Sequence, residues 1–277
     1  MTPEDIEDIV DRALAEDLSS RGDITSEAII PPDSRSRAVI VARQDGVVAG
    51  LEVARHVFAR VDPGVVFETK SVDGDRVSAG SELAFVEGLS RSILTAERTA
   101  LNLLGRMSGV ATATAELVGA VAGTPARITD TRKTMPGLRV LDKHAVAAGG
   151  GINHRMGLYD AVMIKDNHIR AVGDITDAVM RARAAVGPGT PIIVEVEDLE
   201  QLQEVLACDA DRVLLDNMTP EQLSQAVDLV DGRFETEASG GVTLDTVRQI
   251  AESGVDFISA GWITHSAPQL DVALDFG

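Results

Sequence analysis

The sequence predicts an α/β protein with a strand-rich first part and a second part built on a parallel sheet. From residue 127 onward, short and almost continuous apolar runs alternate with helical segments, which is typical of a parallel sheet covered by helices. Six such units occupy about 140 residues, which favours a barrel with fewer than the usual eight strands. The alternative is a doubly wound open sheet, although no Gly-x-Gly-x-x-Gly motif follows its first strand.

The chain is expected to begin with an amphipathic helix over residues 3–17. Within it, Ile6, Val10 and Leu14 recur at a spacing that places them on one helix face. The polar stretch at 19–26 is expected to be a loop. This helix therefore precedes the strands as a separate packing element.

Residues 37–87 follow the period of strands, and the turn residues at 72–80 are typical of a small β-sandwich. The strands are expected at 38–41, 47–49, 65–68 and 83–86, with one short helix at 52–60. A long helical region follows over 90–121, and Gly105 and Gly109 are expected to interrupt it.

Polar side chains end each of the six apolar runs of the second part. The runs are expected to form strands at 127–129, 161–164, 191–196, 212–215, 234–238 and 257–259. The polar ends are Asp130 to Lys133, Lys165 to His168, Glu195 and Glu197, Asp216 and Asn217, Glu237 to Gly241, and Gly261 to His265. Any one of them could be a helix cap. Together they indicate a functional site, because the carboxyl ends of barrel strands form one rim.

The charges on this rim are separated by sign. The basic residues of the first two units are Arg132, Lys133, His154, Arg155 and Lys165. The next two units contribute the acidic residues Glu195 and Asp216. Arginine forks and lysine bind carboxylates and phosphates, and a carboxylate pair beside a phosphate favours Mg²⁺. The alternative is that the two sides neutralise each other as ion pairs.

Two glycine-containing loops follow the last two strands. Ser239, Gly240 and Gly241 lie between a strand and a helix, and Ser259 and Gly261 repeat the arrangement one unit later. Glycine lets backbone N–H groups approach a phosphate closely, and a helix N-terminus adds partial positive charge. The pair of loops therefore predicts a phosphate site.

Composition narrows the class of protein. The net charge of −19 argues against a general affinity for nucleic acid or for an anionic membrane. No apolar run approaches the length of a membrane helix, and the acidic N-terminus does not resemble a signal peptide. The single cysteine, Cys208, is typical of a reducing compartment, so the cytoplasm is expected.

Six motifs in order along the chain resemble those of the quinolinate phosphoribosyltransferase family. They are TAERTALN at 95–102, DTRKTMPGLR at 130–139, GGGINHR at 149–155, IKDNH at 164–168, LDN at 215–217 and EASGG at 237–241. The resemblance implies an N-terminal α/β sandwich over 1–108, joined by 266–277, and an incomplete TIM-like α/β barrel of six to seven strands over 109–265. It also implies a homodimer or a larger homo-oligomer in which Arg98 reaches into the neighbouring subunit's site.

The resemblance implies a pentosyltransferase of NAD biosynthesis. Such an enzyme transfers phosphoribosyl from phosphoribosyl pyrophosphate to quinolinate with decarboxylation, giving nicotinate mononucleotide, CO₂ and pyrophosphate. Quinolinate would be bound by Arg98, Arg132, His154, Arg155 and Lys165. The phosphosugar and Mg²⁺ would be bound by Lys133, Glu195, Asp216, Ser239, Gly240, Gly261 and His265, with Glu195 and Asp216 holding the metal directly or through water.

The catalytic residues implied are Glu195 or Asp216, which would stabilise positive charge on the sugar, and Lys165, which would supply a proton after decarboxylation. Two other enzyme classes remain open. One is a related phosphoribosyltransferase with another heteroaromatic acid as acceptor. The other is a barrel lyase that forms a Schiff base through Lys165. A phosphosugar-binding protein without catalysis is a third reading, and it leaves the density of charged groups on the rim unexplained.

Overall fold

The computed structural model describes residues 1–277 and divides them into two compact units. The first unit consists of 1–115, 134–150 and 263–277, and the second of 116–133 and 151–262. The chain therefore passes from one unit to the other several times. The domain boundary at residue 108 remains a prediction.

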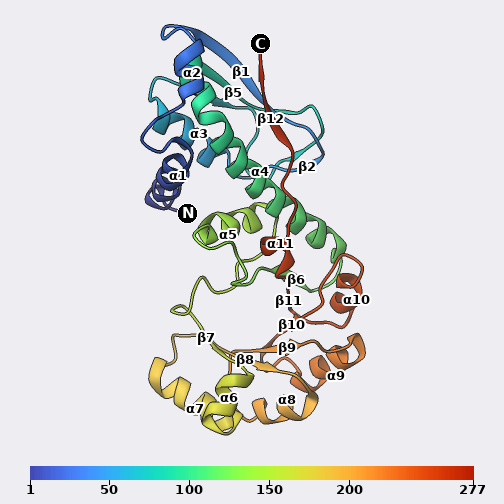
Figure 1. The fold of residues 1–277 in the computed structure, drawn as a ribbon. Coiled ribbons are helices and arrows are strands. Elements are labelled where there is room, and N and C mark those ends of the chain that lie inside the picture. Colours follow the sequence, from blue (N-terminus) through green and yellow to red (C-terminus); the bar gives the residue numbers. More distant parts are fainter. The chain divides into compact units, whose positions relative to one another are not determined.

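The first unit contains an antiparallel sheet of four strands in the order β12-β1-β5-β3. The strands are β1 (Arg35–Ala42), β3 (Val66–Thr69), β5 (Glu82–Leu89) and β12 (Val272–Phe276). A two-stranded ribbon of β2 (Gly46–Val47) and β4 (Arg76–Val77) adjoins them in sequence. Figure 1 shows the C-terminal strand β12 lying along β1. The strands expected near 38–41, 65–68 and 83–86 are confirmed.

Helices belong to the same unit as this sheet. They are α1 (Pro3–Leu18), α2 (Ile24–Ile29), α3 (Leu51–Val61), α5 (Arg139–Ala148) and the first part of α4 (Ser90–Ala120). Thr2 and Asp5 form a capping box that starts α1. The loop expected at 19–26 is wrong in its second half, because Asp23 accepts the N–H groups of Thr25 and Ser26 at 3.1 and 3.0 Å and so starts α2.

The expected interruption of the long helix is also wrong, because α4 runs unbroken through both glycines. A Cβ atom on Gly109 would lie 2.0 Å from the carbonyl oxygen of Pro268, and one on Gly105 would lie 2.9 Å from that of Leu270. The glycines therefore allow the C-terminal segment to pass directly against the helix. Close backbone approach explains them, rather than a break in the helix.

The second unit is built on a parallel sheet of six strands in the order β6-β11-β10-β9-β8-β7. They are β6 (Arg127–Thr129), β7 (Val162–Ile164), β8 (Ile192–Val196), β9 (Arg212–Asp216), β10 (Glu235–Ser239) and β11 (Phe257–Ser259). Within this sheet the first strand in sequence, β6, pairs with the last, β11, as in a barrel. The barrel is not closed, because β6 and β7 do not pair. A parallel bridge from Thr129 to Ile152 extends the β6 edge. An incomplete barrel is thus confirmed over the doubly wound sheet.

Helices follow the strands of this sheet: α6 (Asp166–Val172), α7 (Ile175–Val186), α8 (Leu199–Val205), α9 (Pro220–Val230) and α10 (Val247–Glu252). Figure 1 shows α7, α8 and α9 along the outer side of the sheet. The strands between them are buried, with Ile192, Val194 and Leu215 fully enclosed, which explains their continuous apolar runs. The short α11 (Trp262–His265) follows β11.

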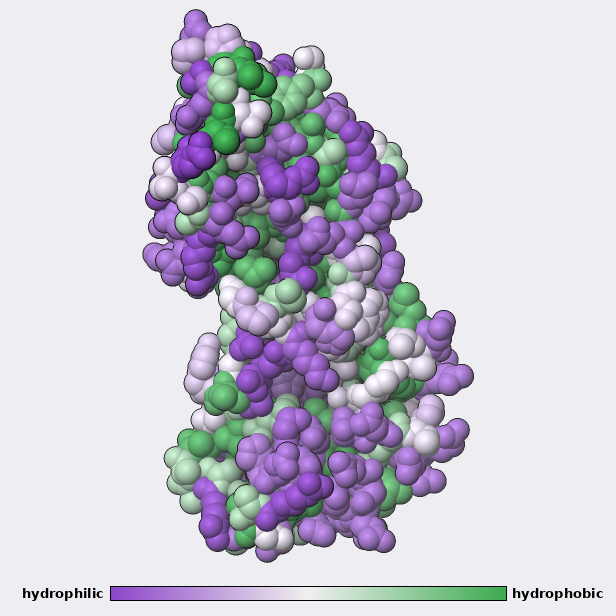
Figure 2. Space-filling model, in the orientation of Figure 1, coloured by the Kyte–Doolittle hydropathy of each residue, from purple (hydrophilic) through white to green (hydrophobic).

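The outside of the protein is polar. Hydrophilic residues cover most of the face displayed in Figure 2, in keeping with the net charge of −19. None of the helices combines the length and the apolar character that crossing a bilayer requires.

Candidate active site

A cavity of about 420 Å³ in the second unit is lined by residues from the carboxyl ends of the barrel strands. It brings together eight side chains that the sequence placed on the rim: Arg132, Lys133, His154, Arg155, Lys165, Glu195, Asp216 and Ser239. It also contains Ser259 of the second predicted glycine loop, and Thr131, Met163, Leu214 and Glu237, to which the sequence assigns no individual role. The predicted convergence of charged groups is therefore present, and the role of each group remains a prediction.

Several positively charged side chains line this cavity together. Arg132 and Lys133 are exposed on the segment that leaves β6. Arg155 is half-buried, and its Nη1 donates to the carbonyl oxygen of Ala161 at 3.0 Å. Burial lowers the pKa of Arg155, and the nearby positive charge of Arg132 lowers it further. The two guanidinium groups therefore repel each other, as expected for a site that binds an anion between them.

Lys165 and Glu195 form an ion pair across two neighbouring strands. The register pairs Ile164 with Val194, so the next residues on β7 and β8 meet side by side. The Glu195 carboxylate is largely buried, whereas the Lys165 side chain is 42% exposed. Part of the rim is therefore neutralised internally, as the ion-pair alternative predicted. The exposed ammonium group still faces the cavity, where an anionic ligand can reach it.

Asp216 is held in position by its neighbour Asn217 and by a glycine. Asn217 donates from Nδ2 to Asp216 Oδ2 at 2.8 Å, and its backbone N–H bonds the carbonyl oxygen of Ser239 at 2.8 Å. Gly240 has φ of 92°, and a Cβ there would lie 2.0 Å from Asn217 Oδ1. Gly240 therefore makes room for the amide that orients Asp216. It does not line the cavity itself.

Two fully buried carboxylates hold His154. Asp130 accepts its backbone N–H at 2.7 Å, and Glu237 Oε2 lies 3.3 Å from Nε2. The other ring nitrogen, Nδ1, accepts the N–H of Arg155 at 2.6 Å, which assigns the proton to Nε2. Burial raises the pKa of Glu237, but His154 and Arg212 more than offset this, so the pKa lies below its usual value and the carboxylate is ionised.

The role of Glu237 is not evident from the sequence, where it stands only as part of a motif at the end of a strand. Its partners Arg212 and His154 are distant from it along the chain. An acidic residue in the middle of a strand between two neighbouring strands of a buried sheet was the available signal, since a buried charge needs a partner.

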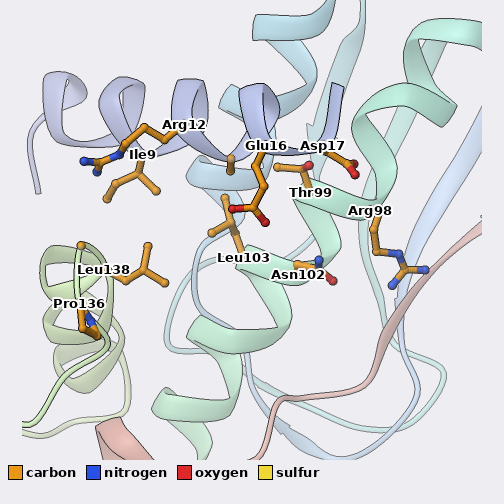
Figure 3. Close-up of a pocket in the computed structure, with 12 residues that line it drawn as sticks. Ile9, Arg12, Glu16, Asp17, Arg98, Thr99, Asn102, Leu103, Pro136 and Leu138 are labelled. Carbon is orange, nitrogen blue, oxygen red and sulfur yellow. The ribbon is translucent and has the colours of Figure 1, made fainter. Parts of the chain in front are cut away.

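Besides Gly240, three predicted residues do not line the barrel cavity. Gly261 follows β11 but does not line the cavity, and His265 ends α11 in the first unit, with Nδ1 2.5 Å from Ser266 Oγ. Arg98 is exposed on α4, also in the first unit. It lines a separate cavity of about 500 Å³ together with residues of α1 and the turn at 136–138. Figure 3 shows Arg98 extending from α4 away from that turn.

The donor set of the barrel cavity fits a magnesium ion brought in by a phosphate ligand. Glu195 and Asp216 line the same cavity, and no group of three acidic, histidine or cysteine side chains converges to form a complete cage. Magnesium typically takes one or two carboxylates and fills its other positions with water and phosphate oxygens. Asp216 is the better placed of the two, because Glu195 is paired with Lys165.

Comparisons with known proteins agree along the whole chain. The family model described as "Quinolinate phosphoribosyl transferase, C-terminal domain" matches residues 110–275, and its N-terminal counterpart matches 23–108. A rice protein (Oryza sativa subsp. japonica) named chloroplastic nicotinate-nucleotide pyrophosphorylase (carboxylating) is 45% identical over 98% of this chain and 77% of its own length. A probable nicotinate-nucleotide pyrophosphorylase (carboxylating) of Bacillus subtilis (strain 168) is 42% identical over 96% of this chain and 92% of its own.

The fold agrees as well. The crystal structure of NadC from Streptococcus pyogenes superposes with a TM-score of 0.95 at 40% sequence identity. The match covers 100% of this chain and 99% of that one. An N-terminal sheet domain followed by an incomplete parallel barrel is therefore an architecture that this chain shares with a solved structure.

Proposed function

This chain belongs to the quinolinate phosphoribosyltransferase family, and from that membership and its barrel site we propose that it converts quinolinate and phosphoribosyl pyrophosphate to nicotinate mononucleotide, CO₂ and pyrophosphate. This makes it a decarboxylating pentosyltransferase of NAD biosynthesis. Both substrates are polyanions, and both have to be bound by a protein whose own net charge is −19.

The observation that carries the proposal is the crowding of cations in the barrel cavity. Arg132, Lys133, Arg155 and Lys165 line one space, although the chain has only four lysines in all. Arg155 is placed where burial and Arg132 both disfavour its charge. Two adjacent carboxylates on a small ring relieve this repulsion, because each can take a planar guanidinium fork.

The first step forms a bond between the ring nitrogen of quinolinate and C1 of the ribose. The nitrogen lone pair makes this bond while the C1–O bond breaks and pyrophosphate leaves with the electron pair. Positive charge develops on the sugar, and the carboxylates of Glu195 and Asp216 lie on the same cavity to stabilise it. Lys133 and Ser239 line the same cavity and are the residues proposed to bind phosphate oxygens.

The second step removes the ring carboxylate next to the nitrogen. The C–C bond to CO₂ breaks, and its electron pair stays on the ring carbon, where the positive charge of the pyridinium nitrogen stabilises it. A proton then adds to that carbon. Lys165 is the proposed donor, because its ammonium group is exposed to the cavity and is held in place by Glu195.

Magnesium is proposed as the ion that accompanies the pyrophosphate group, and it would offset charge on the leaving oxygens. Asp216 would hold it directly, and Glu195 would hold it directly or through water. The orientation of Asp216 by Asn217 supports this role, because that hydrogen bond leaves one carboxylate oxygen, Oδ1, for the metal.

We place the active enzyme in the cytoplasm as a homodimer or a larger homo-oligomer. The single cysteine, Cys208, fits a reducing compartment. Arg98 is exposed in a cavity of the first unit, which supports a role toward a second copy of the chain. Complementation tests this role. Mixed assemblies of Arg98→Ala and Lys165→Ala chains should regain activity, whereas each variant alone should not. No recovery after verified subunit exchange would contradict it.

The activity itself is tested by mixing the protein with Mg²⁺, phosphoribosyl pyrophosphate and quinolinate labelled in the carboxylate next to the nitrogen. Equal amounts of labelled CO₂ and pyrophosphate are expected, and nicotinate in place of quinolinate should give no CO₂. Pyrophosphate release with another ring acid and none with quinolinate would refute the proposal. Trapping of a substrate on Lys165 by borohydride would instead indicate a lyase.

Arg132→Ala tests the carboxylate clamp. The variant removes a guanidinium fork from an exposed segment, so we expect a folded protein that binds quinolinate at least about tenfold more weakly. The measurement is calorimetric titration with quinolinate, with circular dichroism to verify the fold. Binding at wild-type strength would remove Arg132 from the clamp.

A further inference from the structure

A buried ion pair in the first unit joins two helices and lies outside the barrel cavity. Arg106 on α4 donates from Nε and Nη2 to the two carboxylate oxygens of Asp142 on α5, at 3.0 and 2.9 Å. The Asp142 side chain is completely buried, and that of Arg106 is 16% exposed. Such a bidentate pair has a fixed geometry, because the planar fork matches the carboxylate.

The same two side chains also bind backbone groups of two other segments. Asp142 Oδ2 accepts the N–H of Met135 at 3.1 Å, and Arg106 Nη2 donates to the carbonyl oxygen of Thr264 at 2.7 Å. The chain passes back into the first unit at residue 134 and again at residue 263. The ion pair is therefore hydrogen-bonded to the backbone one residue after each of these positions, at Met135 and at Thr264.

The pair is a poor source of stability. Burial raises the pKa of Asp142, and the charge of Arg106 and the hydrogen bond from Met135 do not fully offset this. Buried ion pairs of this kind are often no more stabilising than apolar residues of the same volume. The better explanation for this buried carboxylate is positional. The ion pair holds α4, α5 and the backbone at Met135 and Thr264 together at one point.

We propose that Arg106 and Asp142 are positioning residues for the proposed reaction, which hold the segment after Arg132 and Lys133 by its Met135 N–H and the segment before His265 by its Thr264 carbonyl group. This role rests on the proposed function, because it assigns the pair to the segments that bear the predicted substrate-binding residues. The pair itself touches neither substrate.

The connection to the barrel cavity is short along the chain. Met135 is the second residue after Lys133 and the third after Arg132, so at most about 11 Å of extended chain separates the fastened point from either of them. A second hydrogen bond, from Arg139 Nε to Thr134 Oγ1 at 2.9 Å, restrains the same segment. Displacement of a binding group by about 1 Å can reduce the rate about 100-fold.

Arg106→Lys tests the role with little change in charge. A single ammonium group cannot reproduce the fork to Asp142 together with the bond to the Thr264 carbonyl group. We expect faster hydrogen exchange in the peptides covering 130–139 and 260–266, a quinolinate Kd raised about tenfold or more, and a raised KM with a smaller change in kcat. Asp142→Asn should show the same pattern and serves as the second variant.

Leu83→Ala is the matched control, because Leu83 is fully buried on β5 and contributes to the fold alone. It should lower the urea midpoint of unfolding while leaving the quinolinate Kd and the exchange of both peptides within twofold of the wild type. Unchanged exchange or unchanged Kd in Arg106→Lys would overturn the inference, as would an equal loss of affinity in the control. Failure of the wild-type protein to bind quinolinate would refute the proposed function, and the exchange result would still decide whether the pair fastens both segments.

Discussion

Replacement of Arg155 by Gln separates binding from stability, because quinolinate binding should weaken while the free energy of unfolding stays nearly unchanged. Glutamine is shorter than arginine, so the substitution weakens the hydrogen bond to the Ala161 carbonyl group, now 3.0 Å from Nη1, and it removes the positive charge. The charge is disfavoured in the folded protein, since burial and Arg132 lower the pKa of Arg155. For a base with a lowered folded-state pKa, loss of the charge relieves the folded state at neutral pH.

The magnitudes follow from these contacts. A lost charge-assisted fork to a quinolinate carboxylate weakens binding by about 1.5–3 kcal/mol, or roughly 10- to 150-fold in Kd. A weakened hydrogen bond to Ala161 costs about 0.5–1.5 kcal/mol of stability, and removal of the repulsion between Arg155 and Arg132 offsets it. The free energy of unfolding should therefore stay within about 1 kcal/mol of the wild-type value.

The assay pairs quinolinate titration calorimetry with urea unfolding of the same samples. The comparison is Arg212→Gln, because Arg212 is also an arginine of the barrel but bonds Glu237 at 3.1 Å and Glu235 at 2.6 Å. Its loss removes the charged partner of the fully buried Glu237, which keeps its contact with the His154 ring, and should destabilise the fold by about 3 kcal/mol. A large loss of stability in Arg155→Gln with an unchanged quinolinate Kd would show that Arg155 is structural and refute the reasoning.

Three other outcomes are expected. Gly240→Ala should reduce activity more than tenfold, because its Cβ would meet Asn217 Oδ1 at 2.0 Å and displace the amide that orients Asp216, the carboxylate proposed to bind the metal. Activity near wild type in steady-state kinetics would contradict this. Asp73→Asn should lower stability by about 1–2 kcal/mol at pH 7, because Asp73 accepts two N–H groups at the start of α3 and bonds His144 at 2.8 Å. Burial raises the pKa of Asp73, but these hydrogen bonds hold it below 3.8. In urea unfolding, the difference in free energy of unfolding between wild type and Asp73→Asn should therefore be complete above pH 3.8 and shrink as the pH falls through the lowered pKa of the folded protein. Removal of Mg²⁺ with a chelator should abolish pyrophosphate release and added Mg²⁺ should restore it, whereas full activity in the chelator would exclude the metal from the reaction.

The sequence predicted most of the barrel because its signals there are local. Each strand is an apolar run that ends in polar residues, and the common direction of parallel strands brings those ends together. Lys165, Glu195 and Asp216 could therefore be placed on one cavity without knowledge of the fold in detail. The ion pair between Lys165 and Glu195 was open only as a general alternative, since it depends on the register of β7 against β8.

What the sequence could not predict depends on contacts between distant residues. Gly105 and Gly109 were taken as breaks in a helix, because a glycine required for close packing has the same local signature as one that ends a helix. Glu237 was passed over because Arg212 and His154, which neutralise it, become its neighbours only in the folded barrel. Asp142 showed no local sign of a role because its charged partner, Arg106, lies on α4, 36 residues earlier in the chain.

The arrangement of charge explains how a chain so acidic can bind polyanions. Glu237, a fully buried carboxylate of the cavity, is held by Arg212, so it adds little negative potential there. The cations at the mouth are treated differently, because Arg155 and Arg132 repel one another in the free protein. The repulsion is a cost in the free protein that the bound dianion removes, and this difference between the two states favours binding of a doubly charged acid over a singly charged one.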